Sequence, residues 1–195
     1  MSRLPDLARQ RHGLLRTTVL AAVFGVISVL PGAAQDVTEP SLKAAFVYNL
    51  AKFTEWPADV LPPAAPLVAC VMGETPVAQA LERIVKGRLV MGHSVSVVRL
   101  TGDAPHRSCH LLYAAGLTTA QVGALGAAAQ GAAMLTVIDS DAATRPPMIA
   151  HLFVENGKLR FDLDHGRAKR SRLQLSSKLL PLAKRVYDEP GGAAP

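Results

Sequence analysis

The sequence predicts a single-domain α/β protein, with a mixed β-sheet flanked by helices and a C-terminal β-hairpin and helix. Strand-like and helix-like segments alternate over residues 67–138, which is typical of parallel strands joined by helical crossovers. Two apolar runs then flank Asn156-Gly157, the preferred sequence of a two-residue type I′ turn, and they predict the hairpin. One sheet is therefore expected to contain both parallel and antiparallel pairs.

Residues 1–34 have the features of a cleaved secretory signal peptide. A basic segment precedes an uncharged apolar run over residues 17–30, and small residues lead to an expected cleavage point after Ala34. The apolar run covers about 14 residues, short of the roughly 20 that span a bilayer, although an uncleaved anchor is the alternative. We expect export, one domain over residues 35–188 and a disordered tail over residues 189–195.

The net charge gives little indication of a partner. Loss of the leader removes four arginines and one aspartate, which lowers the formal net charge from +6 to +3. A charge this small on one domain is weak support for binding to nucleic acid or to a membrane surface. We expect no nucleic-acid partner.

The first helix is expected over residues 40–54. Its apolar positions recur with helical spacing, and the predicted sheet-facing side contains Leu42, Ala45, Phe46, Leu50 and Phe53, with Asn49 as its polar member. Trp56-Pro57 ends the helix, because a residue that precedes proline disfavours the helical conformation.

The later elements follow from similar patterns. Strands are expected over residues 67–72, 93–100, 109–114 and 133–138, helices over residues 76–86 and 118–130, and hairpin strands over residues 148–155 and 158–164. A helical segment is expected to begin at residues 167–172. It is expected to continue through residues 173–187, where leucines share one helical face.

Cys70 and Cys109 are the only two cysteines, and each lies in a strand-like segment. An even number of cysteines in an exported chain indicates a disulfide. We therefore expect a Cys70–Cys109 bond, and two buried free thiols are the alternative.

Two groups of side chains are candidate sites of chemistry. His106, Cys109 and His110 lie close together, but they lack the fourth ligand of a closed zinc site, so no metal is expected. Asp139 and Asp141 follow a strand, where paired carboxylates serve either as acid–base groups or as turn formers. The chain has no G-x-S-x-G, H-E-x-x-H or G-x-x-x-x-G-K motif, so neither a catalytic centre nor a cofactor is expected.

One basic cluster follows the hairpin. It consists of Arg167, Lys169, Arg170 and Arg172. A solvated helix face is the simpler interpretation, a contact surface for an acidic partner is the sharper one, and phosphate or anionic lipid is a further alternative.

Three segments resemble the YfiR-like family of periplasmic proteins. They are SLKAAFVYNLAKFTEWP (residues 41–57), LVACVMGETP (residues 67–76) with Cys109 as the later cysteine, and LRFDLDHGRAKRSRLQLSSKLLPLAKRV (residues 159–186). The chain departs from the family pattern at Pro146-Pro147, where glycines are common, and at Asp164, where asparagine is usual. It also lacks a second cysteine pair.

The resemblance implies a non-enzymatic regulator that binds and represses the periplasmic sensor domain of an inner-membrane diguanylate cyclase. Cyclic-di-GMP and biofilm formation would then fall, an outer-membrane lipoprotein could sequester the regulator, and homodimers are possible. Our candidates for partner contacts are Phe153 and Glu155 on the hairpin together with the basic cluster. One alternative function is a periplasmic small-ligand-binding module, coupled to a membrane sensor such as a histidine kinase, with its site at the strand ends near Gly73 and Asp139. The other alternative is a secreted enzyme.

Overall fold

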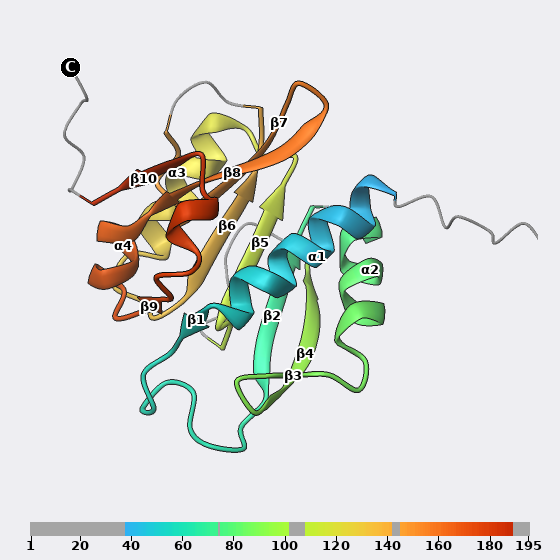
Figure 1. Ribbon diagram of the computed structural model, residues 1–195, viewed down its shortest axis with the longest axis vertical. Helices are drawn as coiled ribbons and strands as arrows, with labels where there is room; N and C mark the ends of the chain where they lie inside the picture. The colour runs from blue at the N-terminus through green and yellow to red at the C-terminus, as the bar shows by residue number, and fades with distance from the viewer. Residues whose placement is uncertain (1–37, 74, 102–107, 142–144, 189–195) are drawn as a thin grey trace, which may run out of the picture. The chain divides into compact units, whose positions relative to one another are not determined.

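An eight-stranded mixed sheet lies at the centre of the computed structural model, in the order β10-β8-β7-β6-β5-β2-β4-β3 (Figure 1). The structure describes residues 38–73, 75–101, 108–141 and 145–188, so the predicted leader, the predicted tail and His106 lie outside it. Its parallel strands are β2 (Leu67–Met72), β4 (His93–Leu100), β5 (Leu111–Ala115), β6 (Leu135–Asp139) and β7 (Ala150–Glu155).

Shorter pairings complete the sheet at both edges. β3 (Leu89–Val90) runs antiparallel to β4, β8 (Lys158–Asp164) runs antiparallel to β7, and β10 (Arg185–Tyr187) runs parallel to β8. β1 (Thr54–Glu55) and β9 (Gln174–Leu175) form a separate antiparallel pair. The mixed α/β architecture with its hairpin is therefore confirmed.

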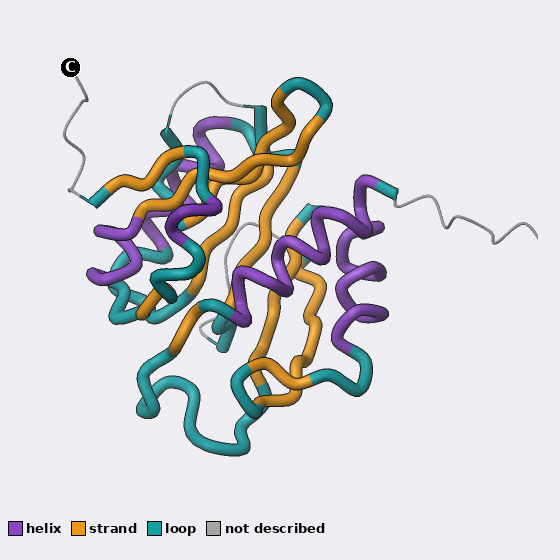
Figure 2. Tube along the Cα trace, in the orientation of Figure 1, coloured by secondary structure: helices purple, strands orange, loops and turns teal. Residues whose placement is uncertain are grey.

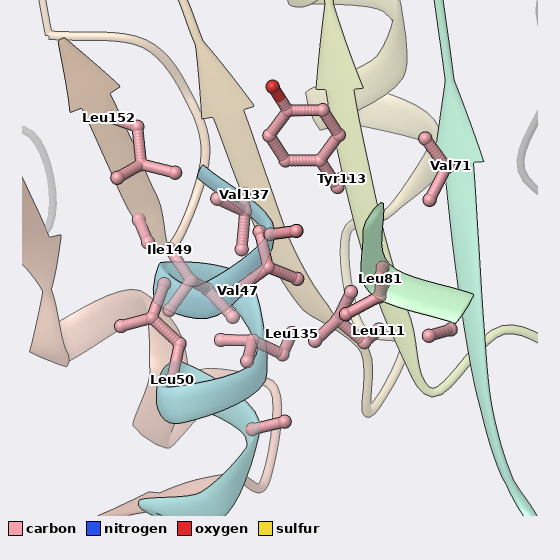
Figure 3. Close-up of a cluster of buried hydrophobic side chains, with 14 of the residues drawn as sticks. Val47, Leu50, Val71, Leu81, Leu111, Tyr113, Leu135, Val137, Ile149 and Leu152 are labelled. Atoms are coloured by element: carbon pink, nitrogen blue, oxygen red, sulfur yellow. The ribbon is translucent and has the colours of Figure 1, made fainter. Parts of the chain in front are cut away.

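Helices cover both faces of the sheet (Figures 1 and 2). α1 (Glu39–Lys52) and α2 (Thr75–Val85) lie on one face, α3 (Thr119–Ala128) lies on the other, and α4 (His165–Arg170) follows β8. A cluster of apolar side chains fills the space beneath α1 and α2, including Val47, Leu50, Leu81, Leu111, Tyr113, Leu135, Val137, Ile149 and Leu152 (Figure 3). This central core fixes the strands from which the surface sites project.

α3 packs closely against the loop that precedes β7. A Cβ atom on Gly126 would lie 2.6 Å from Cγ of Pro147 and 2.7 Å from its carbonyl oxygen. Only a residue without a side chain allows this approach. The close contact next to Pro146-Pro147 is therefore made possible by a glycine on the helix.

The buried face of α1 differs from the predicted one. Ala44, Val47, Leu50 and Ala51 are buried, whereas Leu42 is 39% exposed. The small alanine side chains allow the helix to lie close to both the sheet and α2. The side of the helix that contains the aromatic residues is therefore only partly buried. Phe46 instead makes an edge-to-face contact with Phe161 on β8, with ring centroids 5.7 Å apart.

The expected continuation of the C-terminal helix through residues 173–187 is wrong. Arg172 has a φ of 58°, which ends the helical turn, and the chain then forms β9, a 3₁₀ turn over Leu180–Leu182 and β10. Backbone pairing with β1 and β8 satisfies the amides that a helix would have satisfied internally. Leu173, Leu175 and Leu179 still become buried.

Across the four described stretches, no helix has both the length and the apolar character required to cross a membrane.

Candidate functional site

A disulfide joins two neighbouring parallel strands. Cys70 on β2 is bonded to Cys109, which precedes β5, and their Cα atoms are 5.8 Å apart. Both residues are buried, at 1% and 5% exposure. The structure thus pairs the two cysteines as expected and cross-links the centre of the sheet.

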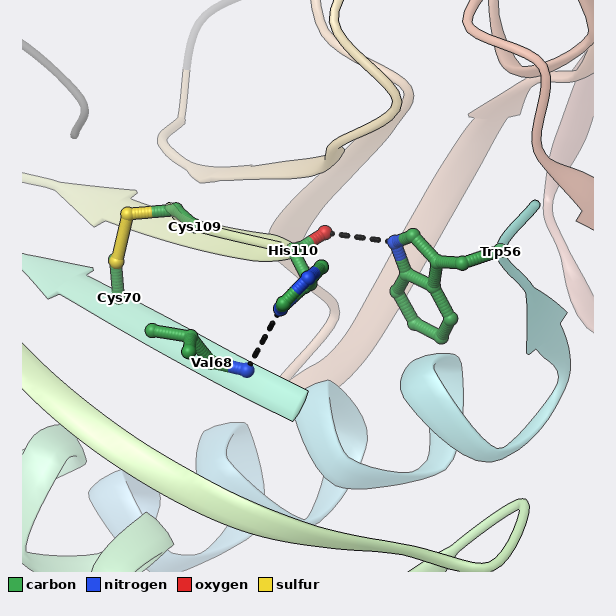
Figure 4. The surroundings of a disulfide bond; sticks show 5 residues. All are labelled: Trp56, Val68, Cys70, Cys109 and His110. Carbon is green, nitrogen blue, oxygen red and sulfur yellow. Dashed lines mark hydrogen bonds between the residues drawn. A yellow bond between two sulfur atoms is a disulfide. The ribbon is translucent and has the colours of Figure 1, made fainter. Parts of the chain in front are cut away.

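His110 ties the disulfide region to the end of α1 (Figure 4). The backbone N–H of Val68 donates to Nδ1 of His110 at 2.9 Å, and Nε2 donates to the carbonyl of Val60 at 3.1 Å. The indole N–H of Trp56 donates to the His110 carbonyl at 2.9 Å. Both ring nitrogens are therefore occupied by backbone groups. Among the described residues no group of three potential metal ligands comes together.

Asp139 fastens α1 to the sheet. Its Oδ2 lies 2.6 Å from Nζ of Lys43 and accepts a 2.7 Å hydrogen bond from the Tyr113 hydroxyl. The Asp139 and Lys43 side chains are only 9% and 10% exposed. Asp139, a candidate acid–base group from its sequence position, is held in a buried ion pair, and Asp141 lines a separate surface pocket.

The two hairpin candidates lie together beside one lysine. Lys184 forms a short ion pair with Glu155 and places its ammonium 5.6 Å from the ring centroid of Phe153. The hydrogen bond from Lys184 lowers the pKa of the Glu155 carboxyl. The hairpin is thereby linked to the segment that leads into β10.

The basic cluster is largely paired within the protein. Nε of Arg167 lies 3.4 Å from Asp164, Lys169 lies 3.6 Å from Asp188, and Arg172 lies 2.9 Å from Asp59. Among the described residues, Arg170 has no acidic partner within ion-pair distance, and it borders a groove beside α3. The cluster therefore presents less unpaired positive charge than its sequence indicates.

An apolar groove that the sequence did not predict lies between α1, β8 and the 3₁₀ turn. We call it the α1 groove. It has a volume of about 400 Å³ and is lined by Phe46, Asn49, Leu50, Phe53, Leu159, Arg160, Phe161, Leu179 and Leu182. Leu182 is 64% exposed at its edge. The aromatic spacing of the first helix is the available signal for this groove, but taken alone it predicts a sheet-facing core.

The residues brought together here belong to the segments that carry the sequence resemblance. Trp56 and His110 connect the first segment to the cysteine segment, and Phe46 meets Phe161 in the last segment. No curated protein matches the chain at a significant level. A family model described as YfiR/HmsC-like matches residues 40–184, which is more than half of the chain. The chain therefore belongs to the YfiR/HmsC-like family.

Proposed function

We propose that this protein is a periplasmic negative regulator that binds the sensor domain of an inner-membrane diguanylate cyclase and lowers cyclic-di-GMP. The YfiR/HmsC-like family consists of periplasmic regulators without catalytic activity. In this proposal the leader over residues 1–34 delivers the protein to the periplasm. Sequestration by an outer-membrane lipoprotein relieves the repression, and a homodimer is a further proposed state.

The α1 groove is the observation that supports protein binding. Apolar residues line most of it, and Leu182 stands 64% exposed at its edge. A contiguous apolar surface of this kind is typical of protein-interaction sites. Phe46 and Phe53 are partly buried there, and they offer the large, rigid contact area that dominates binding energy at protein interfaces.

Polar groups at the α1 groove would fix the orientation of the bound partner. Asn49 and Arg160 line it together with the apolar residues. In this proposal, Phe153 and Glu155 at the hairpin and the basic cluster remain further candidate contacts, separate from the groove. Among the basic residues, Arg170 is the best candidate because it is not engaged by an acidic group in the described part of the chain.

Repression requires differential binding to two states of the partner. A regulator shifts a conformational equilibrium only by the difference between its affinities for the two states. To hold a sensor domain at a ratio of about 99:1 in favour of its inactive state, starting from 1:99, the protein must bind that state about 10⁴-fold more tightly. The groove must therefore recognise a surface that changes when the cyclase becomes active.

The test compares two exposed leucines. Leu182→Asp places a charge in the groove, whereas Leu89→Asp changes a leucine of similar exposure (60%) on β3, at the opposite edge of the sheet. We expect Leu182→Asp to lose recovery of a diguanylate cyclase from native membranes and to raise cyclic-di-GMP, while Leu89→Asp retains both activities. Circular dichroism confirms that both variants are folded.

Two outcomes would contradict the proposal. Equal recovery of the cyclase by the Leu182 and Leu89 variants would exclude the groove as the partner site. Unchanged cyclic-di-GMP after deletion of the gene would exclude repression of a diguanylate cyclase. Recovery of a histidine kinase in place of a cyclase would favour a different membrane sensor as the partner.

A further inference from the structure

Three polar residues form a row across β7, β8 and β10. His151 is the register partner of Asp162 on β8, and Asp162 is in turn the partner of Arg185 on β10. Residues paired in this way project from the same face of a sheet. His151 is also the partner of Ile138 on β6, which belongs to the apolar cluster shared with α3. The row therefore lies on the α3 face, whereas the α1 groove lies on the other face.

The row lines a surface pocket of about 290 Å³, which we call the β10 pocket. Phe153, Val154, Glu155 and Lys184 also line it, together with Asp141, Arg145 and Tyr187. Three acidic and three basic side chains contribute to the lining. The pocket is therefore polar but has no strong net charge of its own.

Asp162 carries an unsatisfied acceptor within this row. The residue is only 8% exposed, and its Oδ1 is buried without a hydrogen-bond partner in the described residues. A buried carboxylate oxygen without a donor is costly, because it has lost water and gained nothing in exchange. A group that supplies a donor at this position would remove the cost.

The neighbours of Asp162 show which donors and acceptors remain available. Nε2 of His151 lies 2.8 Å from the carbonyl oxygen of Ser140. A carbonyl only accepts, so Nε2 carries a proton, and in this tautomer of the uncharged ring Nδ1 is an acceptor. Among the described residues, the Arg185 guanidinium makes one side-chain hydrogen bond, a long 3.5 Å contact with the Tyr187 hydroxyl, so most of its donors remain available to an anion. This hydrogen bond and the nearby Asp162 charge raise the pKa of Arg185.

Three of the other charged side chains in the pocket are already engaged. Lys184 is paired with Glu155, and Arg145 lies 2.5 Å from Asp164 with its guanidinium 4.1 Å from the Tyr187 ring centroid. No group of three potential metal ligands exists among the described residues, which argues against a cation site here. The remaining groups call for a ligand with hydrogen-bond donors at one end and an anion at the other.

We propose that the β10 pocket binds a small hydroxylated carboxylate of the sugar-acid class. Adjacent hydroxyls donate to the Asp162 carboxylate and to Nδ1 of His151, and the ligand carboxylate pairs with Arg185. Phe153 and Tyr187 offer aromatic surface to the C–H face of a sugar ring. This site would make the protein a receptor for an extracytoplasmic metabolite, and it lies on the opposite face of the sheet from the α1 groove.

The probe is D-glucuronate, titrated into the full mature protein by isothermal calorimetry, with D-glucose as the uncharged comparison. We expect glucuronate to bind and glucose to bind much more weakly, because glucose cannot pair with Arg185. At ten times its dissociation constant, glucuronate should raise the melting temperature by about 3–6 °C. Loss of one charged hydrogen bond, in Asp162→Asn or Arg185→Gln, should weaken binding about 10-fold to 100-fold.

Arg99→Gln is the matched control, because Arg99 is a half-exposed arginine on β4 that pairs with Glu82 away from the pocket. It should bind glucuronate as the unchanged protein does. Asp162→Asn should remain folded without ligand, because asparagine has nearly the same shape and the Oδ1 atom of Asp162 makes no hydrogen bond in the described residues. Absence of binding at millimolar glucuronate, or equal binding by the Asp162, Arg185 and Arg99 variants, would overturn the proposal without affecting the partner proposal.

Discussion

Replacement of His110 by alanine is the sharpest test of how the sequence motifs are connected in the fold. The His110 ring accepts from the N–H of Val68 and donates to the carbonyl of Val60. The His110 backbone N–H also donates to the carbonyl of Val68 at 2.9 Å. The ring therefore completes the hydrogen bonding between β2 and β5 at the end where their ladder begins.

The expected loss of stability combines two lost hydrogen bonds with the backbone N–H of Val68, which is left without its acceptor. Each hydrogen bond contributes about 0.5–1.5 kcal/mol, and a buried group left without a partner costs about 1–3 kcal/mol. Val60 and Val68 are both partly buried, so water can recover some of this loss. We expect His110→Ala to reduce the free energy of unfolding by about 2–4 kcal/mol.

Urea denaturation of the oxidised protein, followed by tryptophan fluorescence, measures this change directly. The single tryptophan is Trp56, whose indole donates to the His110 carbonyl, so it reports on the same contact. His93→Ala is the matched control, because the His93 ring makes one hydrogen bond in the described part of the chain, to the Ala65 carbonyl at 2.8 Å. It should cost about 1 kcal/mol.

A loss for His110→Ala no larger than that for His93→Ala would refute the reasoning. His110 would then be dispensable to the stability of the fold. In that case the two ring hydrogen bonds would not connect the loop after α1 to the strands that carry the disulfide.

Three further predictions concern other contacts. Lys43→Met should cost about 3–5 kcal/mol in urea denaturation, because it leaves the Asp139 carboxylate buried without its cation; adding Asp139→Asn should recover much of the loss, and no recovery would contradict a pairwise interaction. Replacing Cys70 and Cys109 by alanine should cost about 3–4 kcal/mol for a sequence separation of 39 residues, and a negligible loss would contradict the entropic estimate. The Glu155 carboxyl should titrate by NMR with a pKa below 4.5, because the hydrogen bond from Lys184 lowers its pKa. The contribution of this ion pair to stability is then complete above pH 4.5 and is lost as the pH falls through the lowered pKa. An unshifted titration would contradict the ion pair.

Local signals in the sequence account for the elements that were predicted correctly. Asn156 and Gly157 both adopt positive φ values, of 51° and 69°, as a type I′ turn requires. The turn brings Glu155 opposite Lys158 and sets the register of the hairpin. Cys70 lies in β2 and Cys109 lies just before the neighbouring strand β5, because the alternating pattern of strands and helices placed both segments in one parallel sheet.

Helical periodicity was misleading where tertiary contacts decided the outcome. The leucines after Arg172 share a helical face, but the chain there pairs with β1 and β8 and contains Pro181 within its 3₁₀ turn. In α1, periodicity identified the helix but not the side that is buried. That side depends on which residues allow close approach to the sheet and to α2, and the sequence of the helix alone does not contain this information.

The sequence by itself determined the fold class, the hairpin, the cysteine pair and the family resemblance, because these depend on neighbouring residues and on short repeating patterns. The tertiary structure alone decided the site geometry. It turned Phe46 and Phe53 into the wall of the α1 groove, neutralised most of the basic cluster, and aligned His151, Asp162 and Arg185 across three strands. Those arrangements depend on contacts between residues distant in the chain, which strand order and register establish only in the folded protein.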